Sequence, residues 1–179
     1  GTHPQRGVYF TRGTSHDEYS AYTEDSNAYL RTMERLALKW QTARTLVPGP
    51  RIRASRPPSR LGAIFFGSTT PSAYEALEEL GARGLAIDTL RLRAFPFPPE
   101  VFDFINRREL VFVIEQNRDG QMRTLLISEG DLAPERLVSI TSYDGLPVAS
   151  RFLVQALESA LAERGVSVPP AAPGQGETP

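Results

Sequence analysis

The sequence of 179 residues contains no cysteine and only two histidines, His3 and His16. Without cysteine the chain can form no disulfide, thiol nucleophile, thiolate zinc site or cysteine-ligated iron–sulfur cluster. Two histidines are also too few for a metal site built from imidazoles alone. The absence of cysteine is typical of the reducing cytoplasm, where we expect this protein to reside.

The chain also lacks a charge excess and long apolar stretches. Its 20 basic and 21 acidic side chains leave a formal net charge of -1, whereas nucleic-acid-binding domains are usually strongly basic. The apolar runs are far shorter than the roughly 18 to 20 residues needed to cross a bilayer, and no signal-peptide pattern opens the chain. We therefore expect neither nucleic acid nor a membrane among its partners.

Apolar residues are nevertheless numerous enough for a folded core. Hydrophobic residues make up 40% of the chain and aromatic residues 9%, which exceeds the usual content of disordered chains. The length suits one domain with an appendage. Because the first residue is Gly rather than Met, we expect a piece of a longer protein.

Residues 1–44 form the first expected segment. It contains an extended stretch at 8–11 and then an amphipathic helix, for which Asp25 and Ser26 are competing N-caps. The apolar residues of this helix recur at spacings of three and four and are Leu30, Met33, Leu36, Ala37 and Trp40.

Residues 45–60 form an expected extended, basic connector. Its prolines exclude a regular helix. Its four arginines, Arg51, Arg53, Arg56 and Arg60, are accompanied by no acidic residue. Two interpretations are open: a solvated linker, which the composition favours, or a segment that docks onto an acidic neighbour or an anionic cofactor.

Residues 61–165 show the pattern of an α/β domain. Apolar runs predict strands at 61–67, 85–92, 110–114 and 137–140. Helical patterns follow them at 72–83, around 101–105, from 121 and from 147. This alternation indicates a three-layer α/β/α fold with a mainly parallel sheet of about four to five strands. Residues 166–179 have low complexity and are expected to be disordered.

Adjacent polar residues at 15–18 suggest a catalytic triad or a metal site at first sight. Triads are recognised by their arrangement in space, and adjacent residues rarely converge in the required geometry. Three consecutive ligands, His16, Asp17 and Glu18, would need a strongly bent backbone and would lack a further histidine. We interpret the segment as a polar turn that fixes its own backbone.

The turn between the first predicted strand and helix of the α/β domain is a candidate anion site. Ser68, Thr69 and Thr70 precede the helix, where free backbone amides and the helix dipole favour negative charge. The turn matches neither the GxGxxG nor the GxxxxGK[ST] motif. The simpler interpretation is a capped helix packed closely on its strand.

A second polar group follows the most apolar strand. Glu115, Gln116 and Asn117 end this strand, and Gln121 opens the next helix. Open α/β sheets bind ligands at the carboxyl ends of their strands, so these side chains contact a ligand or partner, or else hold the loop by hydrogen bonds. No acid, base and nucleophile come together in the sequence. We therefore predict no catalytic residue and no metal ligand.

Short motifs occur in a fixed order along the chain. They are Gly13-Thr14-Ser15-His16-Asp17-Glu18-Tyr19, Thr23-Glu24-Asp25, Phe66-Gly67-Ser68-Thr69, Leu90-Arg91-Leu92-Arg93, Pro96-Phe97-Pro98, Val113-Ile114-Glu115-Gln116-Asn117 with Gly120-Gln121, and Tyr143-Asp144-Gly145-Leu146-Pro147. Together they resemble the alpha subunit of 2-oxoacid:ferredoxin oxidoreductases, particularly of the 2-oxoglutarate type, over about residues 8 to 157. Leu146 stands where the family usually has a basic residue, so an anion contact made there is in doubt.

The resemblance implies one part of a larger enzyme. Such enzymes oxidatively decarboxylate a 2-oxoacid on thiamine diphosphate with Mg²⁺, transfer the acyl group to coenzyme A and pass electrons through an iron–sulfur cluster to ferredoxin. This chain would comprise the end of a pyrimidine-binding domain and a transketolase C-terminal-like domain. The resemblance places the cofactor sites upstream and in the beta subunit, and implies the beta subunit, a gamma domain or subunit, and ferredoxin as partners.

By this resemblance the domain is architectural, binds no cofactor and is inactive alone. The expected contact edge consists of Glu115, Gln116, Asn117 and Gln121. The expected hinge to the upstream domain consists of His16, Asp17 and Glu18. The alternative is a stand-alone module that binds a small anion or regulates another protein through residues 67–70.

Overall fold

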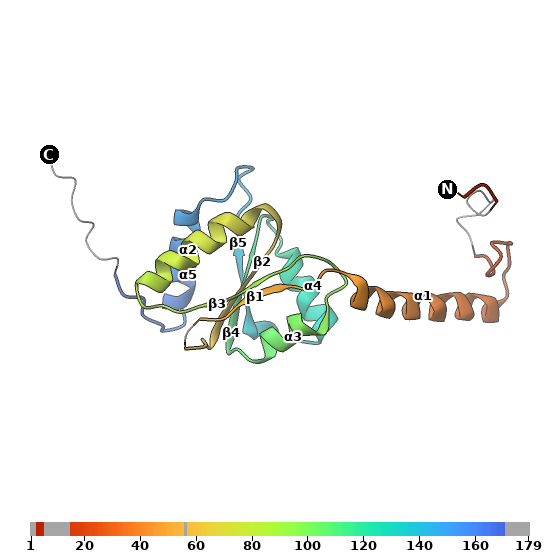
Figure 1. Ribbon diagram of the computed structural model, residues 1–179, viewed down its shortest axis with the longest axis horizontal. Coiled ribbons are helices and arrows are strands. Elements are labelled where there is room, and N and C mark those ends of the chain that lie inside the picture. Colours follow the sequence, from red (N-terminus) through yellow and green to blue (C-terminus); the bar gives the residue numbers. More distant parts are fainter. Residues whose placement is uncertain (1–2, 6–14, 56, 171–179) are drawn as a thin grey trace. The chain divides into compact units, whose positions relative to one another are not determined.

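The computed structural model describes residues 3–5, 15–55 and 57–170. The chain divides into two compact units, an amino-terminal unit of Gly1–Val47 and an α/β unit of Pro48–Pro179 (Figure 1). The extended stretch expected at 8–11 lies outside the described residues. Among the residues that are described, no helix combines the length and apolar character needed to span a bilayer.

A polar turn and one long helix make up the described part of the amino-terminal unit. The Asp17 carboxylate accepts hydrogen bonds from the backbone N–H groups of Tyr19 and Ala21, both at 2.9 Å, and His16 forms an isolated β-bridge with Tyr22. The prediction of a turn that fixes its own backbone is thus confirmed. The role of this turn as a hinge stays a prediction.

Helix α1 spans Ser26–Leu46. Its N-cap is Asp25, whose carboxylate accepts hydrogen bonds from the amides of Asn27 at 3.2 Å and Ala28 at 3.1 Å. Asp25 rather than Ser26 caps the helix because its two oxygens satisfy two otherwise unpaired amides. The apolar positions Leu30, Met33, Leu36 and Trp40 are 45–55% exposed.

The α/β unit is built on a five-stranded sheet in the order β1-β3-β2-β4-β5. The strands are β1 Arg51–Arg53, β2 Leu61–Phe65, β3 Asp88–Arg91, β4 Leu110–Glu115 and β5 Leu137–Thr141. Strands β2 to β5 are parallel, and β1 pairs antiparallel with β3. The prediction of a mainly parallel sheet is confirmed.

Helices cover both faces of this sheet (Figure 1). They are η1 Gly67–Thr69, α2 Thr70–Ala82, α3 Pro99–Asn106, α4 Gln121–Gly130, η2 Pro134–Arg136 and α5 Ser150–Ala162. Helices α2 and α5 pack in one core cluster, and α3 and α4 in the other. The predicted three-layer α/β/α architecture is therefore confirmed.

Alternation along the central strands produces the two cores. In β4, Phe112 and Ile114 belong to the α2/α5 cluster, whereas Val111 and Val113 belong to the α3/α4 cluster. Successive side chains of a strand point to opposite faces, so a strand covered on both faces is apolar at every position. This is why the continuous apolar run at 110–114 predicts a central strand.

Two segments lie closer to the α/β unit than their composition indicates. The stretch 45–60, expected as a connector, contains the end of α1 and then β1, so the α/β unit starts at Pro48 rather than Leu61. Its Ser55 and Ser59 amides donate hydrogen bonds to the Asp88 carboxylate at 2.7 and 3.3 Å. These hydrogen bonds tie Ser55 and Ser59 to β3 and satisfy a buried carboxylate.

The expected disordered tail is also partly ordered. Val166 and Val168 pack against the α2/α5 core, and the Pro169 carbonyl accepts hydrogen bonds from Arg83 at 2.8–2.9 Å. The prediction of disorder from residue 166 is therefore wrong for 166–170, because two valines at alternate positions fit the apolar edge of the core. Residues 171–179 lie outside the described part.

Asp88 forms a buried ion pair at the amino end of β3. It is 1% exposed and accepts hydrogen bonds from Arg108 Nη2 at 2.6 Å and from the Ser55 backbone and hydroxyl, each at 2.7 Å. Burial alone raises the pKa of the Asp88 carboxyl, but hydrogen bonds from Ser55, Arg108 and Ser59 together lower this pKa below its ordinary value. This network lies at the amino end of β3, whereas the candidate site described below lies at the carboxyl ends of the strands.

Candidate functional site

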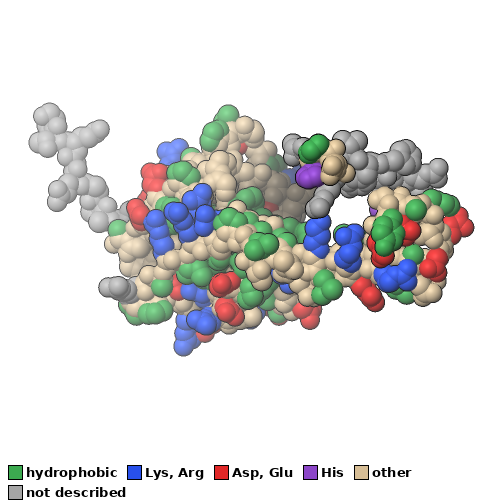
Figure 2. Space-filling model, turned by 45° about the vertical axis from the view of Figure 1, so that its right-hand side comes forward, with side chains coloured by type: hydrophobic (Ala, Val, Ile, Leu, Met, Phe, Trp, Pro, Cys, Tyr) green, Lys and Arg blue, Asp and Glu red, His purple; other side chains and the backbone are tan. Residues whose placement is uncertain are grey.

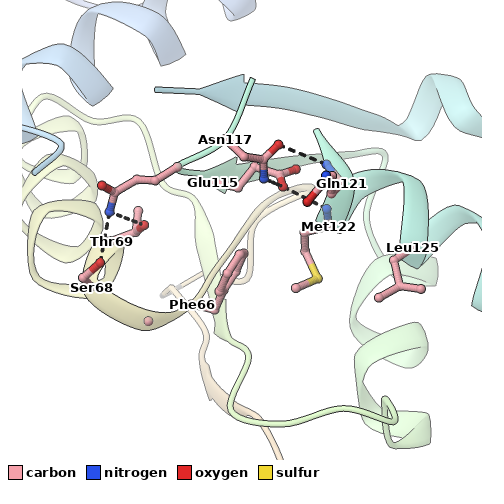
Figure 3. A pocket seen from close by; sticks show the side chains of 10 residues that line it. Phe66, Ser68, Thr69, Glu115, Asn117, Gln121, Met122 and Leu125 are labelled. Carbon is pink, nitrogen blue, oxygen red and sulfur yellow. Dashed lines mark hydrogen bonds between the residues drawn. The ribbon is translucent and has the colours of Figure 1, made fainter. Parts of the chain in front are cut away.

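The carboxyl ends of β2 and β4 lie at a topological switch point. The two strands are neighbours and parallel, but the chain leaves β2 towards α2 on one face and leaves β4 towards α4 on the other. Diverging connections of this kind open a crevice in which α/β proteins bind ligands. A pocket of about 530 Å³ lies there, between residues 66–69, residues 115–117 and the start of α4 (Figure 3).

Glu115 is the buried anchor of this crevice. It is 1% exposed, and its carboxylate accepts hydrogen bonds from the backbone N–H groups of Met122 at 2.8 Å and Arg123 at 3.2 Å. The residue in the N-cap position of α4, Gly120, has no side chain to perform this role. Glu115 therefore caps α4 from the end of β4, where the positive end of the helix dipole stabilises its charge.

Asn117 completes the cap. Its Nδ2 donates a hydrogen bond to the Glu115 carboxylate, and its Oδ1 accepts hydrogen bonds from the amides of Asp119 at 3.0 Å and Gln121 at 3.3 Å. The first three amides of α4, those of Gln121, Met122 and Arg123, thus all have acceptors in this loop. Of the two sequence interpretations, hydrogen bonding that holds the loop applies to Glu115 and Asn117.

Gln116 points to the other wall of the crevice. Its Nε2 donates hydrogen bonds to Ser68 Oγ at 3.2 Å and Thr69 Oγ1 at 3.1 Å, so it joins the two diverging connections (Figure 3). The Thr70 hydroxyl donates to the Gly67 carbonyl at 2.8 Å. The hydroxyls of the candidate anion site are therefore engaged by groups of the protein itself. None of them caps η1 or α2 through its side chain, so the interpretation of a helix capped by hydroxyls is wrong.

Gln121 is exposed to solvent beside this crevice, as is Gln116. Phe66, Met122 and Leu125 supply the apolar part of the pocket wall (Figure 3). The arrangement holds no acid, base and nucleophile in mutual contact. It offers a surface for contact with another molecule, and internal hydrogen bonds already hold most of this surface in place.

A second part of the carboxyl edge of the sheet was not predicted from the sequence to be a site. A pocket of about 650 Å³ follows β5, and a third of about 500 Å³ shares residues with both of the others. Tyr143 and Leu146 line this part and are 67% and 68% exposed. The three pockets thus follow the carboxyl ends of β2, β4 and β5. The sequence feature that could have indicated this part is Leu146 before Pro147, because Leu146 is an apolar residue in a turn where the resembled family has a basic residue.

The remaining candidate residues lie elsewhere. His16, Asp17 and Glu18 belong to the amino-terminal unit, whereas the contact edge and the candidate anion site belong to the α/β unit. In the described ranges, no group of three or more His, Asp or Glu side chains is placed to hold a metal ion.

Replacing Gly120 by alanine is expected to destabilise the α/β unit by about 1 to 2 kcal/mol. Gly120 has a φ of +60°, and a Cβ there would lie 2.9 Å from Ser139 Oγ. Thermal unfolding measures the effect. The double variant with Ser139→Ala should recover the steric part and leave the cost of the backbone conformation; equal Tm values for the wild type and G120A would contradict this assignment.

Comparisons with known proteins place the fold. No family model matches the sequence, and no curated protein matches it. The chain is similar in structure to the 2-oxoglutarate:ferredoxin oxidoreductase from Magnetococcus marinus, solved with 2-oxoglutarate, coenzyme A and succinyl-CoA bound. The TM-score is 0.73 and the sequence identity 20%, over 87% of this chain. This chain spans 27% of the length of that one.

The alpha chain of a probable 2-oxoacid ferredoxin oxidoreductase from Thermoplasma acidophilum also matches, with a TM-score of 0.44 and 19% identity, over 64% of this chain and 97% of that one. The first comparison shows the fold. Over most of its length the chain therefore has the fold of part of a 2-oxoacid:ferredoxin oxidoreductase, the family that its sequence motifs resemble.

Proposed function

We propose that this chain is part of the alpha subunit of a thiamine-diphosphate-dependent 2-oxoacid:ferredoxin oxidoreductase that acts on 2-oxoglutarate. The observation that carries the proposal is the convergence of motifs far apart in the sequence. The segments 66–69, 115–117 and 143–147 follow β2, β4 and β5 and line adjoining pockets at one edge of the sheet. A fold likeness to such an enzyme supports the same assignment.

For two of the groups that such an enzyme uses, Mg²⁺ and an iron–sulfur cluster, the residue types present can be compared with the ligands that each group needs. The described residues contain no group of His, Asp and Glu that could hold Mg²⁺, and the chain has no cysteine for an iron–sulfur cluster. In line with the sequence resemblance, we propose that thiamine diphosphate, Mg²⁺, the cluster and coenzyme A are bound by other parts of the assembly. In this proposal the chain alone is inactive, and the assembly is cytoplasmic.

The role that we propose for the α/β unit is to hold a contact surface for the other subunits. Glu115 and Asn117 fix the start of α4, and Gln116 ties this loop to the turn after β2. Gln121 and Leu146 can then meet a partner without ordering a loop, which lowers the entropic cost of association. We propose the beta subunit as this partner, with a gamma domain or subunit and ferredoxin in the same assembly.

The variant Gln121→Glu should weaken association with the partner subunit about tenfold or more, because an interface would bury an unpaired carboxylate. A negative charge at the first position of α4 is favourable for the helix itself, so folding should not suffer. Titration of the labelled chain with the partner subunit measures the effect. The matched control is Gln155→Glu on α5, which also changes an exposed glutamine. Equal affinities of the two variants for the partner subunit would show that Gln121 does not lie in the interface.

Purification of the tagged chain from its native cells tests the proposal as a whole. Mass spectrometry should identify a subunit with a thiamine-diphosphate site and cysteines for an iron–sulfur cluster in the same complex. The separated chain should show no electron transfer dependent on a 2-oxoacid. Isolation without such a subunit, or activity of the separated chain, would contradict the assignment.

A further inference from the structure

Three arginines share one face of the sheet at its β1 edge. In the β1–β3 ladder Arg51 lies opposite Arg91, and Arg53 lies opposite Thr89. Arg91 is in turn in register with Phe65 of β2, whose side chain belongs to the α2/α5 core. Directly opposed residues project to the same face, so Arg51, Arg53 and Arg91, here called the arginine cluster, gather on the α2 side of the sheet.

An aromatic contact fixes the direction of one member. The guanidinium carbon of Arg53 lies 3.9 Å from the centroid of the Tyr74 ring, and Tyr74 packs edge-to-face on the buried Phe65 at 5.0 Å between centroids. A guanidinium stacked in this way keeps its in-plane N–H donors available for an oxyanion. The stack therefore prepares Arg53 for binding.

The cluster has no counter-charge in the described structure. Other arginines of the α/β unit pair with a carboxylate, namely Arg60, Arg83, Arg108 and Arg118. Figure 2 shows acidic and basic side chains interspersed on the face that it draws. None of the three cluster arginines forms an ion pair among the described residues.

Like charges directly opposite each other destabilise a sheet. Arginines on a short edge strand can serve to block strand pairing between molecules, which accounts for Arg51 and Arg53. It does not account for Arg91, because β3 is an inner strand. The Nε of Arg91 is moreover buried without a hydrogen-bond partner among the described atoms. This buried Nε is out of reach of a partner, but an oxyanion from outside would supply the missing counter-charge at the exposed arginines of the cluster.

We propose that the arginine cluster binds a carboxylate-rich, extended segment of a partner protein. Strand β1 is exposed along its whole length, and the cluster lies outside the pockets of the carboxyl edge, so the cluster offers an open surface to a partner chain. Strand β1 ends the described sheet, and an unpaired edge accepts an extended chain. Acidic residues at alternate positions of that chain would be spaced roughly 6.5 to 7 Å apart, as Arg51 and Arg53 are. The inference rests on no part of the proposed oxidoreductase function.

The test uses the full chain and a fluorescent peptide of about eight residues with glutamate at alternate positions. Fluorescence anisotropy at low ionic strength should show binding that falls about tenfold or more in the variant Arg51→Gln/Arg91→Gln. The charge-matched control Arg107→Gln/Arg151→Gln changes two exposed arginines elsewhere and should bind within about twofold of the wild type.

Three results would overturn the proposal. Absence of peptide binding would leave protection of the sheet edge as the role of Arg51 and Arg53. Equal losses in both double variants would show attraction by net charge alone. Inorganic pyrophosphate that binds more tightly than the peptide would indicate a small-anion site.

Stability provides an independent readout of the same proposal. Because Arg51 opposes Arg91, Arg51→Gln should leave the Tm of the free chain unchanged or raise it. A clear fall in Tm would show that Arg51 stabilises the fold and would contradict its assignment to binding.

Discussion

Replacing Asp88 by alanine is expected to lower the free energy of unfolding of the α/β unit by about 3 to 5 kcal/mol. The change leaves Arg108, whose side chain is 9% exposed, as an uncompensated charge. It also removes the acceptor of the Ser55 and Ser59 amides, which bind the segment after β1 to the sheet. Denaturant unfolding followed by circular dichroism measures the loss.

The matched control is Glu109→Ala. Glu109 pairs with Arg60, but these side chains are 66% and 80% exposed, and such pairs contribute about 0 to 1 kcal/mol. A similar loss in both variants would show that the Asp88 network has no special role in stability.

The same carboxylate predicts a dependence of stability on pH. The pKa of Asp88 is lowered from its ordinary value of 3.8, so the folded state holds the proton less tightly than the unfolded state does. The stabilisation is therefore fully present above the unfolded pKa and is lost as the pH falls through the folded pKa. Below about pH 4 the free energy of unfolding should fall more steeply with pH for the wild type than for Asp88→Asn. Parallel plots of this free energy against pH for the two proteins would contradict this role of Asp88.

Glu115→Ala is expected to cost about 2 to 3 kcal/mol, because it leaves the Met122 and Arg123 amides and the Asn117 side chain without their acceptor in a buried place. Glu115→Gln retains one carbonyl acceptor and should cost less. Hydrogen exchange should show faster exchange of the Met122 and Arg123 amides than in the wild type.

The comparison for Glu115 is Glu100→Ala. Glu100 is an exposed acid in the first turn of α3, where its contribution should be below about 1 kcal/mol. Unchanged hydrogen-exchange rates at the start of α4 in Glu115→Ala would show that the cap does not hold this loop. This result would also contradict the proposal that the contact edge is ordered before a partner binds.

Local patterns account for most of the central strands. The apolar runs at 61–67 and 110–114 contain β2 and nearly all of β4, because a strand covered on both faces needs apolar side chains at every position. Strand β1 carries no such pattern. Its Arg-Ile-Arg sequence has one apolar residue and lies between prolines, so only its pairing with β3, about 36 to 40 residues further along the chain, makes it a strand.

The position of the candidate edge could be predicted, but the directions of its side chains could not. The place of Glu115 and Asn117 at the end of an apolar strand follows from the sequence, whereas their inward direction depends on the left-handed backbone at Gly120 and on the start of α4. Gln116 meets Ser68, 48 residues away, and no local pattern carries such a contact.

The most direct test of the proposed function is electron transfer by the complete assembly that contains this chain. With 2-oxoglutarate and coenzyme A, the purified complex should reduce ferredoxin, and omission of either compound should abolish the reduction. Complex assembled with Gln121→Glu should lose activity at subunit concentrations at which Gln155→Glu retains it. A complete complex that reduces ferredoxin with no 2-oxoacid would contradict the account.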